Sequence, residues 1–250
     1  MLRSPFVVLV VSLVVLWLSV KIGVTLACKL GPVKNEERDH FTLVMSASLT
    51  LLALIIGFSF SMAVSRYDQR KNYEEEEANA IGTEYVRSDL LPAMEAANIR
   101  RLLVQYIDER LLFYTSRDPN QLESIDNETK RLQTEMWSAV QSAAETLPTP
   151  TAALAVAGMN DVLNRQGYAQ AARWNRIPVE AWSLMIALAI CCCVLTGYGA
   201  RRPGIVLFIA FPLIVSLAFF LIADLDSPRR GVIRVAPQNL ISLSHSLHTH

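Results

Sequence analysis

Four long apolar stretches dominate the pattern of hydrophobic and polar positions along this chain. A helix needs roughly 20 consecutive apolar residues to cross a bilayer. The stretches that meet this requirement are Pro5–Leu26, Phe41–Val64, Pro178–Tyr198 and Gly204–Ala223. The first contains one charged residue, Lys21, the third contains only Glu180 at its start, and the other two contain none. The pattern therefore predicts four membrane-spanning helices.

The segment between the second and third spans has the 3.6-residue apolar period of helices that pack on one another. Proline starts a helix more readily than it continues one, so breaks are expected at Pro92, at Asp118–Pro119 and at Pro148–Pro150. Four helices follow, at about residues 66–90, 93–116, 120–146 and 151–173. The predicted fold is an all-α membrane protein with a helical insert between its second and third transmembrane helices.

This pattern divides the chain into four parts. Residues 1–64 hold the first pair of transmembrane helices, 65–177 the helical insert, 178–223 the second pair, and 224–250 a C-terminal tail. The first span can also be read as a secretory signal. Its apolar run is longer than a typical signal core and lacks a small-x-small cleavage site, so a retained helix is favoured.

Composition supports the membrane assignment and offers little chemistry. Of 250 residues, 52% are hydrophobic and only 18% are charged, against about 25% charged in typical soluble domains. The formal net charge of zero gives no indication of nucleic-acid binding. The sequence contains no glycine-rich phosphate loop, serine nucleophile elbow or Cys-x-x-Cys pair, so no enzyme activity, catalytic residue, metal or cofactor is predicted. The run Cys191–Cys193 reads either as a lipidation or redox site or, with more weight, as small apolar residues in a helix.

The distribution of basic residues predicts the orientation in the membrane, because positive charges in short flanks prefer the cytoplasm. With the N-terminus inside, the cytoplasmic flanks hold nine basic residues: Arg3, Arg66, Arg70, Lys71, Arg173, Arg176, Arg229, Arg230 and Arg234. The outer loops hold five: Lys29, Lys34, Arg38, Arg201 and Arg202. Nine against five places both termini and the insert in the cytoplasm, although the Arg201–Arg202 pair argues the other way.

An acidic run, Glu74–Glu77, lies early in the insert. It reads either as a cation-attracting ring or metal site, or as a solvated helix face. Four successive helical residues point around most of the circumference and cannot all bind one ion, which favours the solvated face. In an oligomer, one of the four can still form a ring about the symmetry axis. The histidine-containing end of the chain is expected to be a frayed polar terminus.

A cluster of charges is expected where the second and fourth spans end. Arg66 and Arg70 follow the second span, and Asp224 and Asp226 close the fourth. Carboxylates at the edge of the hydrocarbon region are costly unless solvated or paired. The alternatives are an ion pair between one aspartate and one arginine, and separate snorkelling of each side chain to interfacial water.

The second span also carries a recognisable pattern. A Gly-Phe pair at Gly57–Phe58 is followed, eight residues after the Phe, by Arg66 and Tyr67, which resembles the second transmembrane helix of bestrophins. Three further segments resemble a bacterial bestrophin-like family across nearly the whole chain: Ser65–Asp68, Glu77–Gly82, and Asp224–Gly231 with Arg234–Pro237. The resemblance implies a protein of the bacterial inner membrane.

By this resemblance the protein is a homo-oligomer, a pentameric ion channel in membrane lipid that passes small ions, with the second helix around a central pore. The resemblance implies a hydrophobic neck at Thr50, Leu54 and Phe58, of which Thr50 departs from the apolar pattern. Calcium binding is not implied, since Pro228–Gly231 replaces the Pro-Phe-Gly segment of bestrophins and no acidic run follows. From the residues alone, Leu54 and Phe58 are expected to face lipid or another helix, as apolar membrane residues usually do. The rival function is a non-conducting scaffold or sensor whose insert binds a ligand or partner.

Overall fold

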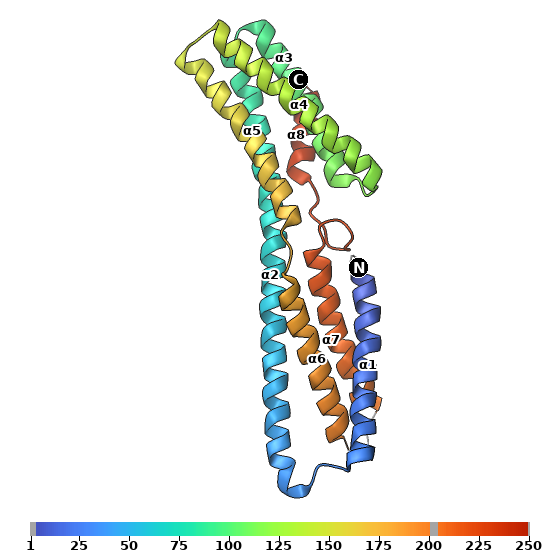
Figure 1. Cartoon of the computed structure of the whole chain (residues 1–250). Coiled ribbons are helices and arrows are strands. Elements are labelled where there is room, and N and C mark those ends of the chain that lie inside the picture. Colours follow the sequence, from blue (N-terminus) through green and yellow to red (C-terminus); the bar gives the residue numbers. More distant parts are fainter. Residues whose placement is uncertain (1–3, 201–204, 250) are drawn as a thin grey trace. The chain divides into compact units, whose positions relative to one another are not determined.

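The computed structural model describes residues 4–200 and 205–249, and within them every regular element is a helix (Figure 1). The membrane-type helices are α1 (Pro5–Leu30), α2 (Arg38–Arg87), α6 (Val179–Gly199) and α7 (Ile205–Asp226). The insert holds α3 (Ala93–Thr115), α4 (Pro119–Thr146) and α5 (Pro150–Trp174), and α8 (Gln238–His248) lies near the C-terminus. The short 3₁₀ helices η1 (Asn35–Glu37) and η2 (Ser88–Leu90) precede and follow α2. The predicted all-α fold with four spanning helices is confirmed.

The predicted helix breaks also occur where the prolines stand. Pro119 and Pro150 are the first residues of α4 and α5, where the missing N–H of proline costs no helical hydrogen bond. The residue before each proline caps the helix. The Asp118 side chain accepts from the Asn120 N–H at 3.0 Å, and the Thr149 hydroxyl accepts from the Ala152 N–H at 3.1 Å.

The chain forms two compact units. The first, here called the spanning unit, comprises Met1–Tyr67 and Arg176–Arg234; the second, the helical unit, comprises Asp68–Asn175 and Val235–His250. Helix α2 contributes its first part to one unit and its last part to the other. The segment 224–250, which the sequence suggested as one tail, is therefore divided, with residues 235–250 belonging to the helical unit.

In the spanning unit, α1 and α6 cross backbone against backbone. A Cβ atom added to Gly23 of α1 would overlap the Val194 carbonyl oxygen and lie 2.9 Å from the Tyr198 nitrogen. A Cβ atom added to Gly197 of α6 would overlap the Val20 carbonyl oxygen. Small residues at a crossing allow close van der Waals packing, which drives helix association where no hydrophobic effect operates.

The cysteines of the same unit pack as small apolar residues of a helix, the interpretation favoured from the sequence. Cys192 and Cys193 are both fully buried in its apolar core, while Cys191 is exposed. The two buried residues act as small apolar side chains.

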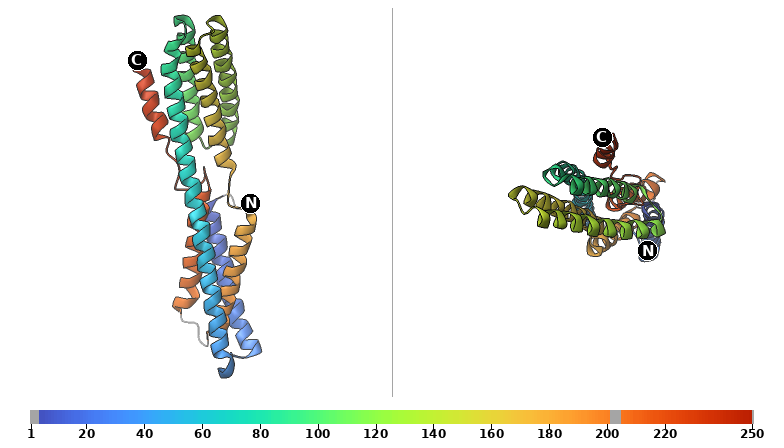
Figure 2. Two further views of the ribbon diagram at one scale, coloured as in Figure 1. Left: turned by 90° about the vertical axis from the view of Figure 1, so that its left-hand side faces the viewer. Right: turned by 90° about the horizontal axis from the view of Figure 1, so that it is seen from above.

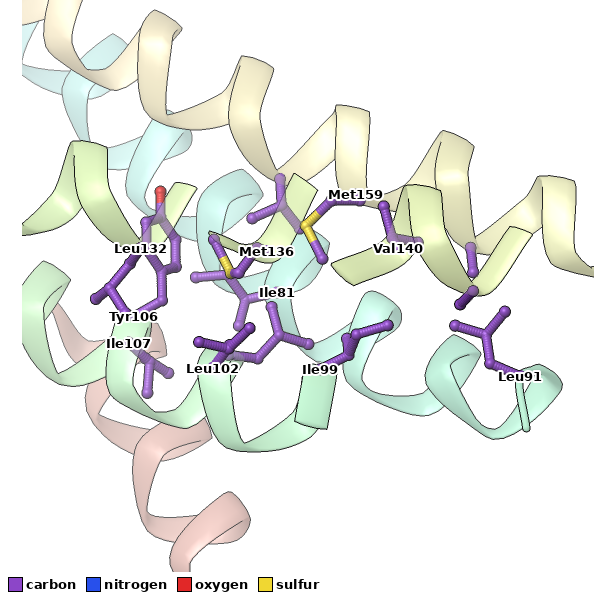
Figure 3. Close-up of a cluster of buried hydrophobic side chains, with 14 of the residues drawn as sticks. Ile81, Leu91, Ile99, Leu102, Tyr106, Ile107, Leu132, Met136, Val140 and Met159 are labelled. Carbon is purple, nitrogen blue, oxygen red and sulfur yellow. The ribbon is translucent and has the colours of Figure 1, made fainter. Parts of the chain in front are cut away.

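The core of the helical unit is built from α2, α3, α4 and α5 (Figure 3). Their apolar stripes interdigitate as the sequence period predicted. The largest fully buried apolar residues of this core are Ile81, Ile99, Leu102, Leu103, Tyr106, Ile107, Leu132, Met136 and Met159.

The expectation of a frayed C-terminus is wrong, because the described residues 238–248 form the helix α8. Figure 2 shows α8, in red, beside α2 within the helical unit. Leu240 is fully buried there, and its N–H donates to the Glu74 carboxylate at 3.0 Å. This carboxylate caps the N-terminus of α8, although Glu74 lies 166 residues away from Leu240 in sequence. His248 Nε2 lies 3.5 Å from the Asp108 carboxylate, while His250 lies outside the described residues.

Candidate functional site

The spanning part of α2 is the least covered of the four spans. Only 6% of its most apolar stretch is buried within the chain, against 28% for α1 and 39% for α7. The side of α2 that packs on the rest of the spanning unit is marked by Leu52, Ser59 and Ala63, which are at most 2% exposed. The remainder of the helix surface is left for lipid, water or another protein chain.

Thr50, Leu54 and Phe58 lie on this uncovered side. All three are exposed, Leu54 by 51% and Phe58 by 60%. At roughly 100° per residue, Thr50 and Leu54 point about 160° away from the packed side and Phe58 about 120° away. The face that sequence spacing grouped together therefore points away from the core of its own chain.

Hydroxyl groups share the same face but do not by themselves require water. The Thr50 hydroxyl donates to the Ser46 carbonyl oxygen at 2.9 Å, within the helix. Such back-bonding satisfies the hydroxyl locally, so that it tolerates an apolar environment. Exposed Ser46, Ser61 and Ser65 continue the polar stripe along the helix.

At the end of the spanning unit, the structure brings two of the four expected charges together. Arg66 Nη1 lies 3.9 Å from Asp226 Oδ1, and both side chains are largely buried. The same Asp226 oxygen accepts from the Ile177 N–H at 3.0 Å. Asp226 thus holds the segment before α6 as well as facing Arg66. Arg70 belongs to the helical unit and is 6% exposed there.

Asp224 has a different role, because backbone amides occupy its carboxylate. Its two oxygens accept from the N–H groups of Val232 at 2.7 Å and Ile233 at 2.8 Å. Gly231 packs against this turn, where an added Cβ atom would lie 2.7 Å from the Asp224 carbonyl oxygen. The residues that follow α7, from Ser227 to Ile233, therefore form a loop folded around the Asp224 carboxylate, and substitution of Asp224 or Gly231 disturbs it.

The solvated-face interpretation of Glu74–Glu77 is wrong for two of its four residues. Glu74 and Glu77 are at most 1% exposed, whereas Glu75 is exposed and Glu76 pairs with Arg165 at 2.6 Å. Within the described residues, no group of three or more His, Cys, Asp or Glu side chains is placed to hold a metal ion. The run serves to hold helices together.

Glu77 forms the centre of a buried polar cluster that sequence reasoning missed. Its carboxylate forms an ion pair with Arg110, and the Tyr114 hydroxyl donates to it at 3.1 Å. The Arg110 guanidinium also lies 4.2 Å from the centre of the Phe113 ring, and Arg173 covers that ring at the same distance. Burial acts to lower the pKa of Arg110, but the adjacent Glu77 carboxylate raises it above its ordinary value overall. Arg110 is therefore charged at every physiological pH.

The comparisons with known proteins agree with this architecture. The family model described as the Bestrophin-like domain matches residues 9–240. The chain is similar to a crystal structure of a bacterial bestrophin homologue from Klebsiella pneumoniae with one Leu-to-Thr substitution. That comparison has a TM-score of 0.69 and 16% identity, covering 96% of this chain and 98% of the other. A zinc-phased structure of a bestrophin homologue from the same organism has a TM-score of 0.65 and 17% identity, covering 95% of each chain.

At such identities the structural likeness demonstrates a shared fold. No curated protein matches the chain by sequence. The family model, by contrast, spans nearly the whole chain, from the first helix to the start of α8. The chain belongs to the Bestrophin-like family.

Proposed function

We propose that this protein is an oligomeric ion channel or channel-like pore in which α2 surrounds a central pathway with a hydrophobic neck. Support comes from its membership of the Bestrophin-like family and from its fold, which matches bacterial bestrophin homologues. The resemblance of the α2 motif to bestrophins favours a homopentamer embedded in membrane lipid, with small ions as the permeating species. The proposal requires no cofactor and no catalytic step.

The observation that carries the proposal is the uncovered face of α2. Thr50, Leu54 and Phe58 lie on that face, one helical turn apart. Around a symmetry axis each position gives a ring, and the rings stack along the axis. Water and ions avoid a narrow ring of apolar side chains, because an ion there loses hydration without gaining replacement ligands. Leu54 and Phe58 are suited to that role, and Thr50 adds a polar ring beside them.

The proposed location is the bacterial inner membrane, with both termini and the helical insert in the cytoplasm. One end of the spanning unit contains Pro5, Ile177 and the ion pair of Arg66 and Asp226. The basic residues that flank this end outnumber those of the outer loops, which favours a cytoplasmic side. Arg3 and the Arg201–Arg202 pair, which enter that comparison, lie outside the described residues.

Ion flux through reconstituted liposomes tests the proposal, after the size of the detergent-solubilised oligomer has been measured. A five-fold ring is expected, and a monomer or dimer refutes a central pore. Phe58→Ala widens and rewets the neck, so ion flux should rise, by about tenfold if the neck barrier falls by about 1.4 kcal/mol.

Phe60→Ala is the matched control. Phe60 is an exposed aromatic residue of the same helix, and it points about 200° away from Phe58. Its removal should change the flux little. If both variants and the parent form intact oligomers that pass no ions, the scaffold or sensor function becomes the better account.

A further inference from the structure

Glu84 is a buried acidic residue that takes no part in the proposed pore. It lies in the last turn of α2, within the helical unit, and is 0% exposed. Neither carboxylate oxygen has a hydrogen-bond partner among the described residues. The other two buried acids of this helix differ, because Glu74 accepts from α8 and Glu77 pairs with Arg110.

A notch in α5 makes room for this carboxyl group. A Cβ atom added to Gly158 would overlap Glu84 Oε2 and lie 2.7 Å from Nη1 of Arg87. The carboxyl group thus packs directly on the α5 backbone, where any residue other than glycine would displace it. Two helices of the unit, α2 and α5, meet at this point.

An ionised carboxylate is costly in such a place, since burial without hydrogen bonds disfavours the charged form. The pKa of Glu84 is raised to about 8, chiefly by burial; Arg87 on the same helix acts to lower this pKa, and Asp161 on α5 acts to raise it. Arg100 of α3 is engaged elsewhere, with Asp89 and with the Ser88 hydroxyl. The neutral acid therefore predominates near pH 7.

We propose that Glu84 is a proton-binding site of the helical unit. The neutral carboxyl group fills the Gly158 notch, and release of its proton to solvent under weakly alkaline conditions weakens the contact between α2 and α5. The carboxylate then gains solvation only if the two helices part or its side chain leaves the notch. This site does not depend on whether the protein conducts ions.

The expected pH dependence has a definite sign. In the unfolded chain Glu84 has the ordinary pKa of 4.5, whereas in the folded chain its pKa is about 8. Between these values the folded state binds more protons than the unfolded state, so its stability falls as the pH rises. Below pH 4.5 and above pH 8, this residue adds no further slope.

Thermal unfolding of the full-length protein in detergent tests this dependence from about pH 4 to about pH 9, a range that brackets the ordinary and the raised pKa of Glu84. Glu84→Gln replaces the neutral acid with a neutral amide of the same shape. Its Tm relative to the parent should increase across this range, by roughly 5 °C or more. Glu75→Gln, an exposed acid on the same helix, should follow the parent. Parallel curves for Glu84→Gln and the parent overturn the proposal.

Infrared spectroscopy gives a direct second measurement. The parent should show the carbonyl stretch of a protonated carboxyl group at pH 7, and this band should disappear as the pH rises past 8. Glu84→Gln should lack the band. If Glu84→Gln does not fold, the Gly158→Ala variant is measured instead, because its added methyl group displaces the Glu84 carboxyl group toward solvent. The band should then disappear at lower pH, and an unchanged titration refutes the notch.

Discussion

The buried pair of Glu77 and Arg110 allows a sharp prediction about stability. Both side chains are 0% exposed, and the carboxylate also accepts from the Tyr114 hydroxyl. Glu77→Gln keeps the shape of the side chain but leaves the Arg110 charge buried without a counter-charge. Removing one partner of a buried pair typically costs about 3–5 kcal/mol. Since whole domains are stable by only about 5–15 kcal/mol, the helical unit should lose much of its stability.

The size of this effect follows from how few other groups compensate the buried charge of Arg110. Nη1 of Arg110 already lacks a hydrogen-bond partner among the described residues, so the guanidinium depends on Glu77 for its compensation. The Phe113 ring 4.2 Å away offers a cation–π contact. Such a contact contributes about 0.5–2 kcal/mol, which is less than the loss.

Unfolding by heat or denaturant, followed by circular dichroism of the detergent-solubilised protein, measures this effect. Glu75→Gln is the control, because Glu75 is exposed and such changes usually stay within about 0.5 kcal/mol. The double variant Glu77→Gln with Arg110→Met removes both charges and should recover much of the loss. If Glu77→Gln behaves like Glu75→Gln, or if the double variant loses the sum of the single losses, the pair does not act as described.

Two further predictions concern the spanning unit and its orientation. Gly23→Ala should destabilise the spanning unit by about 3 kcal/mol or more, because the added methyl group overlaps backbone atoms of α6 that no rotamer change can move. Thermal unfolding measures this loss of stability. Gly57→Ala is the control and should be tolerated, because the space around Gly57 is open. A single cysteine at Glu128 in an otherwise cysteine-free protein should react with an impermeant reagent only after cell lysis, and labelling of intact cells would invert the proposed topology.

Much of the fold was predictable because its signals are local. Spans such as Phe41–Val64 are identified by their length and apolar composition alone. The ends of the insert helices are marked by a proline with a capping residue before it, as at Asp118 and Thr149. Helix α8 was missed because its cap is Glu74, which is remote in sequence, and because eleven residues with three serines and two histidines carry little helical signal of their own.

The charges at the end of the fourth span show what sequence spacing leaves open. Asp224 and Asp226 are two residues apart and chemically identical, so either was a candidate partner for an arginine. In the structure, the two carboxylates differ in the backbone N–H groups that donate to them. Two amides of the following loop donate to Asp224, whereas Asp226 accepts one amide, with the same oxygen that lies near Arg66. The path of the loop, set partly by the lack of a side chain at Gly231, decides this.

The acidic residues Glu74–Glu77 of α2 were predicted to form a solvated face, although the helical period distinguishes the buried ones from the exposed ones. Glu74, Glu77 and Glu84 fall within about 80° of one another around the helix, on the stripe that also carries the buried Ile81. Glu75 lies off that stripe and is exposed. Period alone thus predicts which acids are buried.

The helical period does not predict the group that a buried acid contacts. For Glu77 that group is Arg110, 33 residues further along the chain, and for Glu74 it is the Leu240 amide, 166 residues further. Each contact exists only once the helical unit has assembled. Glu84 lies on the same stripe and receives neither kind of partner. Three chemically identical side chains on one helix face therefore have different surroundings, and the one without a hydrogen-bond partner is the proposed proton-binding site.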